Sequence, residues 1–233
     1  MYTIIHFEKL GIILGGIMNN IIEQFRKMDT ATVSDAMDKI GIECALLDVK
    51  PLSSDFKICG KAFTVSYIPC GTVKGTVGDF IDDVKQGEVV VIDNNGRTDC
   101  TVWGDIMSTY SKQRNIEATV IDGVCRDVPT ILDLEYPVFS KGYTMRTGKD
   151  RVEVESVNQD IQISGIRVKN GDIILGDASG VIAIPQEKAE EVYEIAKVIH
   201  EKESLIGEEI KNGSTLKEAR EKHGYHHLQT KEV

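Results

Sequence analysis

Three ionisable residues in the middle of the chain have the types and spacing for metal-assisted and acid–base chemistry: Asp105, Arg126 and Asp127. Twenty residues separate Asp105 from Arg126, and all three lie in the segment from Trp103 to Pro129. A carboxylate binds a hard divalent cation or transfers a proton, and a guanidinium binds a carboxylate through two parallel hydrogen bonds. Together these groups suit the chemistry of a 2-oxo acid.

The sequence between these residues predicts one helix and one returning strand. The helical pattern covers Ile106 to Gln113, and an apolar strand from Ala118 to Ile121 is expected to stop at Asp122 and Gly123. Such a unit brings the chain back near its start. We therefore expect the three residues to share one cleft at the carboxyl ends of strands, where α/β folds bind ligands.

Structural roles for the same residues stay open at this point. Asp127 precedes Val128, Pro129 and an apolar helix, so a role as a helix cap is one alternative. Arg126 could simply form an ion pair with Asp105 or Asp122.

The rest of the chain contains helix patterns near its two ends and a β-rich region after Tyr136. Helices are expected over Ile21 to Met28, Val33 to Ile40 and, with a long amphipathic pattern, Gln186 to Ile210. Tight turns are expected at Asp93 to Gly96 and at Asp177 to Gly180. Strand patterns cover Lys61 to Ile68, Gly87 to Ile92, Tyr136 to Phe139, Arg151 to Val157, Asp160 to Ile163, Ile166 to Val168, Ile173 to Leu175 and Val181 to Ile184.

The domain organisation predicted from these patterns is one α/β domain over residues 18–213, preceded by an extension over residues 1–17 and followed by a polar tail over residues 214–233. The apolar run from Leu10 to Ile17 is far shorter than the roughly twenty residues that span a bilayer. The start of the chain also lacks the basic region and cleavage site of a signal peptide. No membrane partner is therefore expected, and the absence of a cysteine framework, described next, favours a reducing cytoplasm.

Composition excludes several classes of function. The chain of 233 residues has a formal charge of −10 and no cluster of basic residues, which argues against a nucleic-acid partner. Its five cysteines form no C-x-x-C pair, so neither a zinc ribbon nor a disulfide framework is indicated. The glycine-rich run from Gly71 to Asp79 could cradle a phosphate, but its spacing matches no nucleotide-binding motif, and a flexible loop is favoured.

The residues around the candidate site resemble a known family. WGDIMS before the helix, VIDGVCRDV around Arg126 and Asp127, and the following YPVF are similar to the class II pyruvate aldolases of the 4-hydroxy-4-methyl-2-oxoglutarate aldolase family, which includes the regulator of ribonuclease activity A. The resemblance extends from about Ile21 to Gly213 and includes GDIILGDASGVIAIP. It implies an α/β, swivelling β/β/α fold with a central β-sandwich or barrel flanked by helices. It also implies a homotrimer or a dimer of trimers (a homohexamer), with the site between subunits.

The resemblance implies a metal centre that holds Mg²⁺ or Mn²⁺. Asp127 matches the direct metal ligand of the family, with water and substrate in the other positions. Glu203 matches a glutamate that a neighbouring subunit contributes to the outer shell of the metal.

The resemblance also assigns the substrate contacts. Arg126 matches the residue that binds the substrate and stabilises the enolate, and Asp105 matches the carboxylate that orders a proton-transferring water. The backbone at Gly104, with the amides of Asp105, Ile106 and Met107, is expected to hold the pyruvyl carboxylate.

The implied reaction is the metal-dependent retro-aldol cleavage of a 4-hydroxy-2-oxo acid, such as 4-hydroxy-4-methyl-2-oxoglutarate, to pyruvate. Such an enzyme is a carbon–carbon lyase, and decarboxylation of oxaloacetate through the same enolate is an expected side activity. The alternative is a non-catalytic binding protein similar to the regulator of ribonuclease activity A. That lineage keeps the Arg-Asp pair but lacks the acid before the helix, so Asp105 favours the enzyme. A methyltransferase is disfavoured because no glycine-rich nucleotide loop is present.

Overall fold

The central sheet is buried on both faces, which explains why its strands are almost continuously apolar. The computed structural model describes residues 20–73 and 75–225. In it, the side chains of β3 (Glu88–Thr101) alternate between two hydrophobic cores. Val89 and Val91 face the inner core between strands, and Val90 and Ile92 face the core under the helices. The predicted extension over residues 1–17 lies outside the described residues.

Eight strands form one mixed sheet in the order β1-β5-β4-β3-β2-β9-β10, with β6 paired to β2 beside this path. The parallel strands are β2 (Ile58–Pro69), β3, β4 (Ala118–Cys125) and β5 (Val138–Tyr143). The strands that pair antiparallel are β1 (Lys50–Pro51), β6 (Val152–Val157), β9 (Ile173–Asp177) and β10 (Gly180–Ile184). A separate hairpin consists of β7 (Ile161–Ile163) and β8 (Ile166–Val168).

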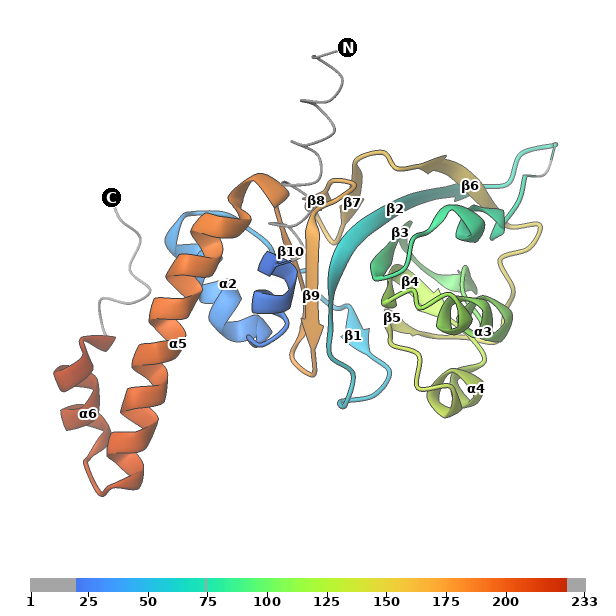
Figure 1. Ribbon diagram of the computed structural model, residues 1–233. Coiled ribbons are helices and arrows are strands. Elements are labelled where there is room, and N and C mark those ends of the chain that lie inside the picture. The colour runs from blue at the N-terminus through green and yellow to red at the C-terminus, as the bar shows by residue number, and fades with distance from the viewer. Residues whose placement is uncertain (1–19, 74, 226–233) are drawn as a thin grey trace, which may run out of the picture.

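The sheet curls until its two ends approach each other (Figure 1). The segment before β1 joins β10, because Ala45 bridges Ile182 and the Leu46 amide donates to the Val181 carbonyl at 3.0 Å. The enclosed inner core contains Phe139 of β5 and Ile174 of β9. The predicted α/β class, with a central β layer flanked by helices, is confirmed.

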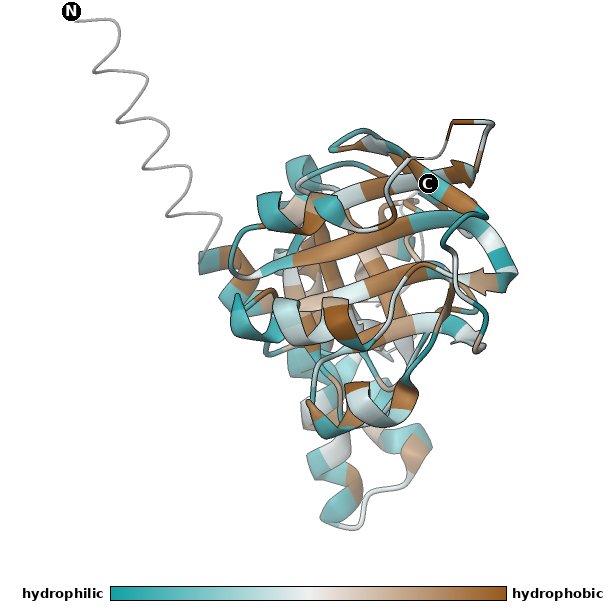
Figure 2. Ribbon diagram, turned by 90° about the vertical axis from the view of Figure 1, so that its right-hand side faces the viewer, coloured by the Kyte–Doolittle hydropathy of each residue, from teal (hydrophilic) through white to brown (hydrophobic). Residues whose placement is uncertain are grey.

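Helices cover the two outer sides of this β layer. Residues 20–25, α2 (Thr30–Lys39) and α5 (Ala189–Lys211) pack on β9 and β10. On the other side lie α3 (Asp105–Gln113), α4 (Val128–Asp133) and a 3-10 helix (Asp79–Asp83). Figure 2 shows the apolar residues concentrated along the strands, with more polar helices outside. No helix in the described ranges is long and apolar enough to cross a membrane.

Two predicted breaks in the strands are wrong. β4 does not stop at Asp122 and Gly123, and β3 continues through the predicted turn from Asp93 to Gly96. The pairing of β3 with β4 instead shifts register here, and Asn95 and Gly96 have φ values of 53° and 65°. The turn-forming residues therefore form a bulge inside a long strand, because a bulge requires the same backbone conformations as a turn.

The predicted turn from Asp177 to Gly180 joins β9 and β10 as an antiparallel hairpin. The described part of the predicted polar tail contains α6 (Leu216–His223), which packs on the far end of α5 through Ala219 and Ile206.

Candidate active site

The three predicted site residues lie at one edge of the sheet because β3 and β4 are parallel neighbours. After β3, a short connection leads to Asp105, the first residue of α3, and Arg126 and Asp127 follow β4 directly. The Arg126 amide donates to the carbonyl of Trp103 at 3.0 Å, which joins the two connections. The structure thus brings Asp105, Arg126 and Asp127 together as predicted.

Asp127 directs its carboxylate toward α3 and not into its own helix. It occupies the N-cap position of α4, yet its side chain makes no capping hydrogen bond, and its backbone is left-handed (φ 59°, ψ 35°). Its Oδ2 accepts the Asp105 amide at 3.3 Å and lies 3.2 Å from Arg126 Nε. Capping therefore does not account for this carboxylate.

The alternative ion pairs considered for Arg126 are also wrong. Its guanidinium pairs with Asp127, whereas Asp122 pairs with Lys141, with 2.6 Å between Lys141 Nζ and Asp122 Oδ1. Asp105 instead accepts the amide of Ile106 at 2.8 Å through Oδ1.

Gly104 allows the close approach of these groups. A Cβ added at this residue would lie 2.7 Å from Asp127 Oδ2 and 3.2 Å from Arg126 Nε. The first distance is shorter than real Cβ contacts, so any other residue would displace the carboxylate. The resemblance assigned Gly104 a backbone role toward substrate but did not indicate this steric one.

A cavity of about 480 Å³ opens beside the site. Its floor includes Asp105, Met107 and Arg126, and one wall is the loop from Gly75 to Asp79. This loop belongs to the glycine-rich run that was predicted to be only a flexible connection. Its position after β2, a third parallel strand ending at the same edge, is the signal that could have assigned it to the site.

The segment from Thr144 to Arg151 forms another wall, which the sequence did not indicate. The Thr144 amide donates to the Cys125 carbonyl at 3.0 Å, and the Thr101 amide donates to the Arg146 carbonyl at 2.9 Å. These bonds fix the segment against the ends of β4 and β3, and Lys149 lines the cavity.

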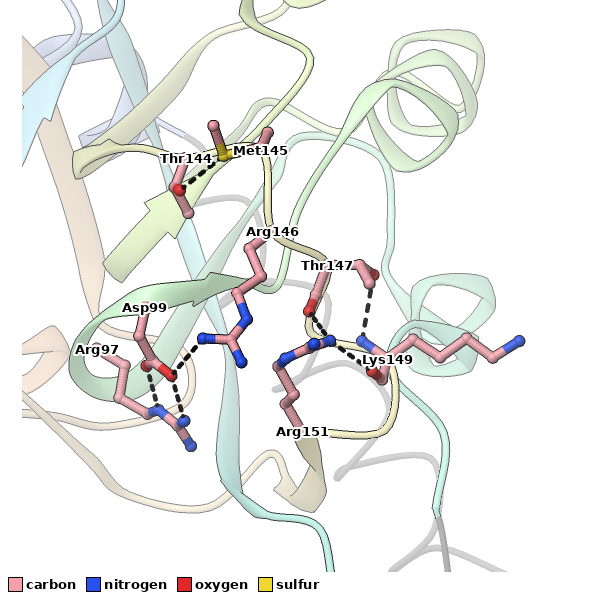
Figure 3. A network of polar contacts seen from close by, with 8 residues as sticks. All are labelled: Arg97, Asp99, Thr144, Met145, Arg146, Thr147, Lys149 and Arg151. Carbon is pink, nitrogen blue, oxygen red and sulfur yellow. Dashed lines mark hydrogen bonds and ion pairs between the residues drawn. The ribbon is translucent and has the colours of Figure 1, made fainter.

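Positive side chains gather along this segment (Figure 3). Arg97 forms a bidentate pair with Asp99, with both hydrogen bonds at 2.9 Å, and Arg146 lies 4.0 Å from the same carboxylate. Arg151 donates to the carbonyls of Thr147 and Lys149 and is thereby held against the loop. Of the basic side chains near the cavity, Arg126 and Lys149 belong to its lining, which also contains the acids Asp79 and Asp105.

Two buried cysteines, Cys100 and Cys125, lie on the strands that lead to the site. Burial raises the pKa of Cys100 on β3 and of Cys125 on β4. Both thiols therefore stay protonated at neutral pH.

The carboxylates present suit a hard cation with few protein ligands. In the described residues, no group of three or more His, Cys, Asp or Glu side chains is arranged to hold a metal ion. Both contacts of Asp127 to described residues use Oδ2, which leaves Oδ1 for a cation, and the side chain is 35% exposed. Mg²⁺ commonly takes one or two carboxylates, with water and substrate oxygens as its other ligands.

Glu203 is not brought to the other site residues within one chain. It lies on α5, on the opposite side of the β layer from α3 (Figure 1). Burial, together with the nearby charges of Asp35 on α2 and Asp29 at its N-cap, raises the pKa of Glu203. Its predicted contribution from a neighbouring subunit stays a prediction.

The fold and this site define a class of α/β protein with a ligand cavity at the carboxyl ends of parallel strands. The chain belongs to the RraA-like family, described as Aldolase/RraA, whose model matches residues 30–183. The predicted family is therefore confirmed.

Three similar proteins illustrate this membership. Protein DlpA of Legionella pneumophila is 40% identical over 220 residues, which are 93% of this chain but only 36% of DlpA. A protein of Halalkalibacterium halodurans named "Putative 4-hydroxy-4-methyl-2-oxoglutarate aldolase" is 33% identical over 180 residues, covering 76% of this chain and 82% of the relative. An uncharacterized protein of Pseudomonas syringae has a solved structure with a TM-score of 0.82 and 39% identity, covering 87% of this chain and 97% of the other.

The steric role of Gly104 is testable by Gly104→Ala. Because the new Cβ would clash with Asp127 Oδ2, we expect the carboxylate to move away from the Asp105 amide, with a loss of about 1–3 kcal/mol of stability. A crystal structure and chemical denaturation measure the two effects. Gly207→Ala on α5, where an added Cβ meets nothing within 4 Å, is the matched control. An unmoved Asp127 in Gly104→Ala would contradict the steric role.

Proposed function

We propose that the chain is a divalent-metal-dependent lyase that cleaves a 4-hydroxy-2-oxo acid, such as 4-hydroxy-4-methyl-2-oxoglutarate, by a retro-aldol reaction that releases pyruvate. The observation that carries this proposal is the convergence of Asp105, Arg126 and Asp127 around Gly104 beside a cavity. Relatives named as aldolases support lyase chemistry in general.

Asp127 is the proposed ligand of Mg²⁺ or Mn²⁺ through its free Oδ1 atom. Its other oxygen is held by the Asp105 amide and by Arg126, so the carboxylate has a fixed direction before a cation arrives. When bound, the metal would polarise the 2-oxo group of the substrate. Glu203 of a neighbouring subunit is the proposed outer-shell partner.

Arg126 and the start of α3 are the proposed binding site for the pyruvyl end of the substrate. The first amides of a helix attract anions, and α3 begins at the cavity with Asp105, Ile106 and Met107. The Asp105 and Ile106 amides already donate to Asp127 Oδ2 and Asp105 Oδ1, so a substrate carboxylate would share these donors with the two acids. Arg126 adds a positive charge at the same place and would offset the negative charge that develops on the pyruvyl oxygen. Lys149 in the cavity lining is a further cation that would attract an anionic substrate in a chain with a charge of −10.

Asp105 is the proposed proton-transfer group, acting through a water. The Ile106 amide holds its Oδ1, so Oδ2 is the atom left to accept a proton from that water. Loss of the proton from the C4 hydroxyl would start the cleavage of the adjacent carbon–carbon bond. Decarboxylation of oxaloacetate needs the same stabilised charge and is the proposed side activity.

A non-catalytic binding protein of the same family is the alternative function. The RraA-like fold is compatible with both functions, so the fold does not distinguish them. Asp105 in the cavity lining favours the enzyme, because a binding protein has no need of a proton-transfer group there.

The site is proposed to lie between subunits of a homotrimer or a dimer of trimers. Val73, Ile106 and Met145 are 88%, 79% and 87% exposed, and each lies in or within two residues of the cavity lining. Exposed apolar side chains gathered at one place commonly mark a protein interface. Light scattering of the purified protein is expected to give three or six times the 25.8 kDa mass of one chain. A monomer at micromolar concentration would contradict the proposed assembly.

Metal-dependent pyruvate release is the primary test of the reaction. With Mg²⁺ or Mn²⁺, the protein is expected to release pyruvate from 4-hydroxy-4-methyl-2-oxoglutarate and, more slowly, from oxaloacetate, and a chelator should abolish both activities. Asp127→Ala should remove the metal-dependent rate because it removes the proposed ligand. Pyruvate formation is followed by coupling to lactate dehydrogenase. No metal-dependent pyruvate from either compound would refute the proposed function.

Substitutions at Asp105 and Arg126 separate chemistry from folding. Asp105→Asn keeps an oxygen for the Ile106 amide but removes the proton acceptor, so kcat is expected to fall by about 10²-fold or more. Arg126→Ala should lower kcat by a similar factor because charge stabilisation is lost. Asp83→Asn, exposed and outside the cavity lining, is the matched control. Wild-type kcat with a lowered unfolding midpoint would make these residues structural.

A further inference from the structure

We infer that Ser108 is a positioning residue for the site: its hydroxyl fixes the peptide group between Gly104 and Asp105, so that the Asp105 amide points toward Asp127. Ser108 lies in the first turns of α3 and is fully buried. What the amide then does for a substrate rests on the proposed function, in which the Asp127 carboxylate that it holds would bind the metal that the pyruvyl end chelates.

The direction of both hydrogen bonds at Ser108 is fixed by chemistry. The indole Nε1 of Trp103 lies 2.8 Å from Ser108 Oγ, and Ser108 Oγ lies 2.9 Å from the carbonyl oxygen of Gly104. An indole nitrogen can only donate and a carbonyl can only accept. The hydroxyl proton of Ser108 must therefore point at the Gly104 carbonyl, and its lone pair must accept from Trp103.

Trp103 is itself a fixed anchor. Its ring is buried and stacks on Tyr136, with ring centres 6.2 Å apart and planes at 14°. The Tyr136 hydroxyl in turn lies 2.9 Å from Thr119 Oγ1 on β4. The position of the Ser108 hydroxyl is thus set by the sheet and not only by its own helix.

The peptide group links this anchor to the site. The carbonyl of Gly104 and the amide of Asp105 belong to one planar trans peptide, so they point in opposite directions. Ser108 holds the carbonyl end through its hydroxyl at 2.9 Å and its amide at 3.1 Å. The amide end consequently points at Asp127 Oδ2, 3.3 Å away.

Gly104 is the residue at which such a restraint matters most. It has no Cβ to limit its backbone, and its extended conformation (φ −158°, ψ −162°) is one of many open to glycine. The steric clash described above prevents a side chain from supplying rigidity at this residue. The hydrogen bond from the Ser108 hydroxyl to the Gly104 carbonyl supplies this restraint instead.

A serine hydroxyl bonded to the carbonyl four residues earlier is also a common local motif in helices. Two observations give it a further role here. The bonded carbonyl belongs to the peptide that opens the helix at the site, and the hydroxyl is oriented by a side chain from outside the helix.

Ser108→Ala tests the inference with a readout that stability alone does not change. Hydrogen exchange of the Asp105 amide, followed by NMR well below the unfolding temperature, is expected to be about tenfold faster than in the wild type, because one hydrogen bond that holds the peptide is lost. Affinity for oxalate with Mg²⁺, a mimic of the pyruvyl end, should fall by about tenfold. Ser111→Ala is the control, since Ser111 is equally buried on α3 but is not the residue whose hydroxyl bonds the Gly104 carbonyl.

The outcomes separate the two proposals. Unchanged exchange at Asp105 in Ser108→Ala, or equal acceleration in Ser111→Ala, would overturn the role of Ser108. Faster exchange with unchanged affinity for oxalate and Mg²⁺ would also overturn it, because the amide would then not position the Asp127 carboxylate for binding. If oxalate does not bind the wild type, the proposed function fails, and the exchange result alone decides whether Ser108 orients the peptide.

Discussion

The close approach of Gly104 to the Asp127 carboxylate is the constraint on which the site depends. Two connections that follow neighbouring parallel strands must pass each other with no side chain between them, and only glycine satisfies this at 2.7 Å from Oδ2. The approach places a backbone amide, a guanidinium and a carboxylate within hydrogen-bonding range. The curled sheet fixes the two strands, because each is buried on both faces. The core therefore contributes to the site by keeping β3 and β4 side by side as parallel neighbours.

The second constraint on the site is the net negative charge of the chain, which basic groups near the cavity partly offset. A chain with a charge of −10 repels an anionic substrate at long range. The site offsets this with Arg126, with the start of α3, and with the segment that carries Arg146 and Lys149. Hydrogen bonds to Thr101 and Cys125 fix that segment to the ends of both strands. Arg126 and Lys149 thus both line the cavity although they come from separate segments of the chain.

The sequence predicted the parts of the site that are local and missed those that depend on tertiary pairing. Asp105, Arg126 and Asp127 are joined by one helix and one strand, so their spacing along the chain was sufficient to place them together. The loop from Gly75 to Asp79 and the segment that contains Lys149 reach the cavity only through the order of strands in the sheet. The bulge in β3 was missed for a related reason, since Asn95 and Gly96 suit a turn and a bulge equally well.

The left-handed backbone conformation of Asp127 is the last feature of the site that requires a physical explanation. A residue other than glycine in the left-handed region is uncommon, although aspartate tolerates it better than most. Such a conformation costs stability and persists only where its surroundings impose it. Here the carboxylate forgoes a capping bond to α4 and contacts Arg126 and the Asp105 amide instead. A residue needed only for folding would gain more from capping its own helix. The conformation of Asp127 is therefore explained by its contacts with Arg126 and the Asp105 amide, and not by capping of α4.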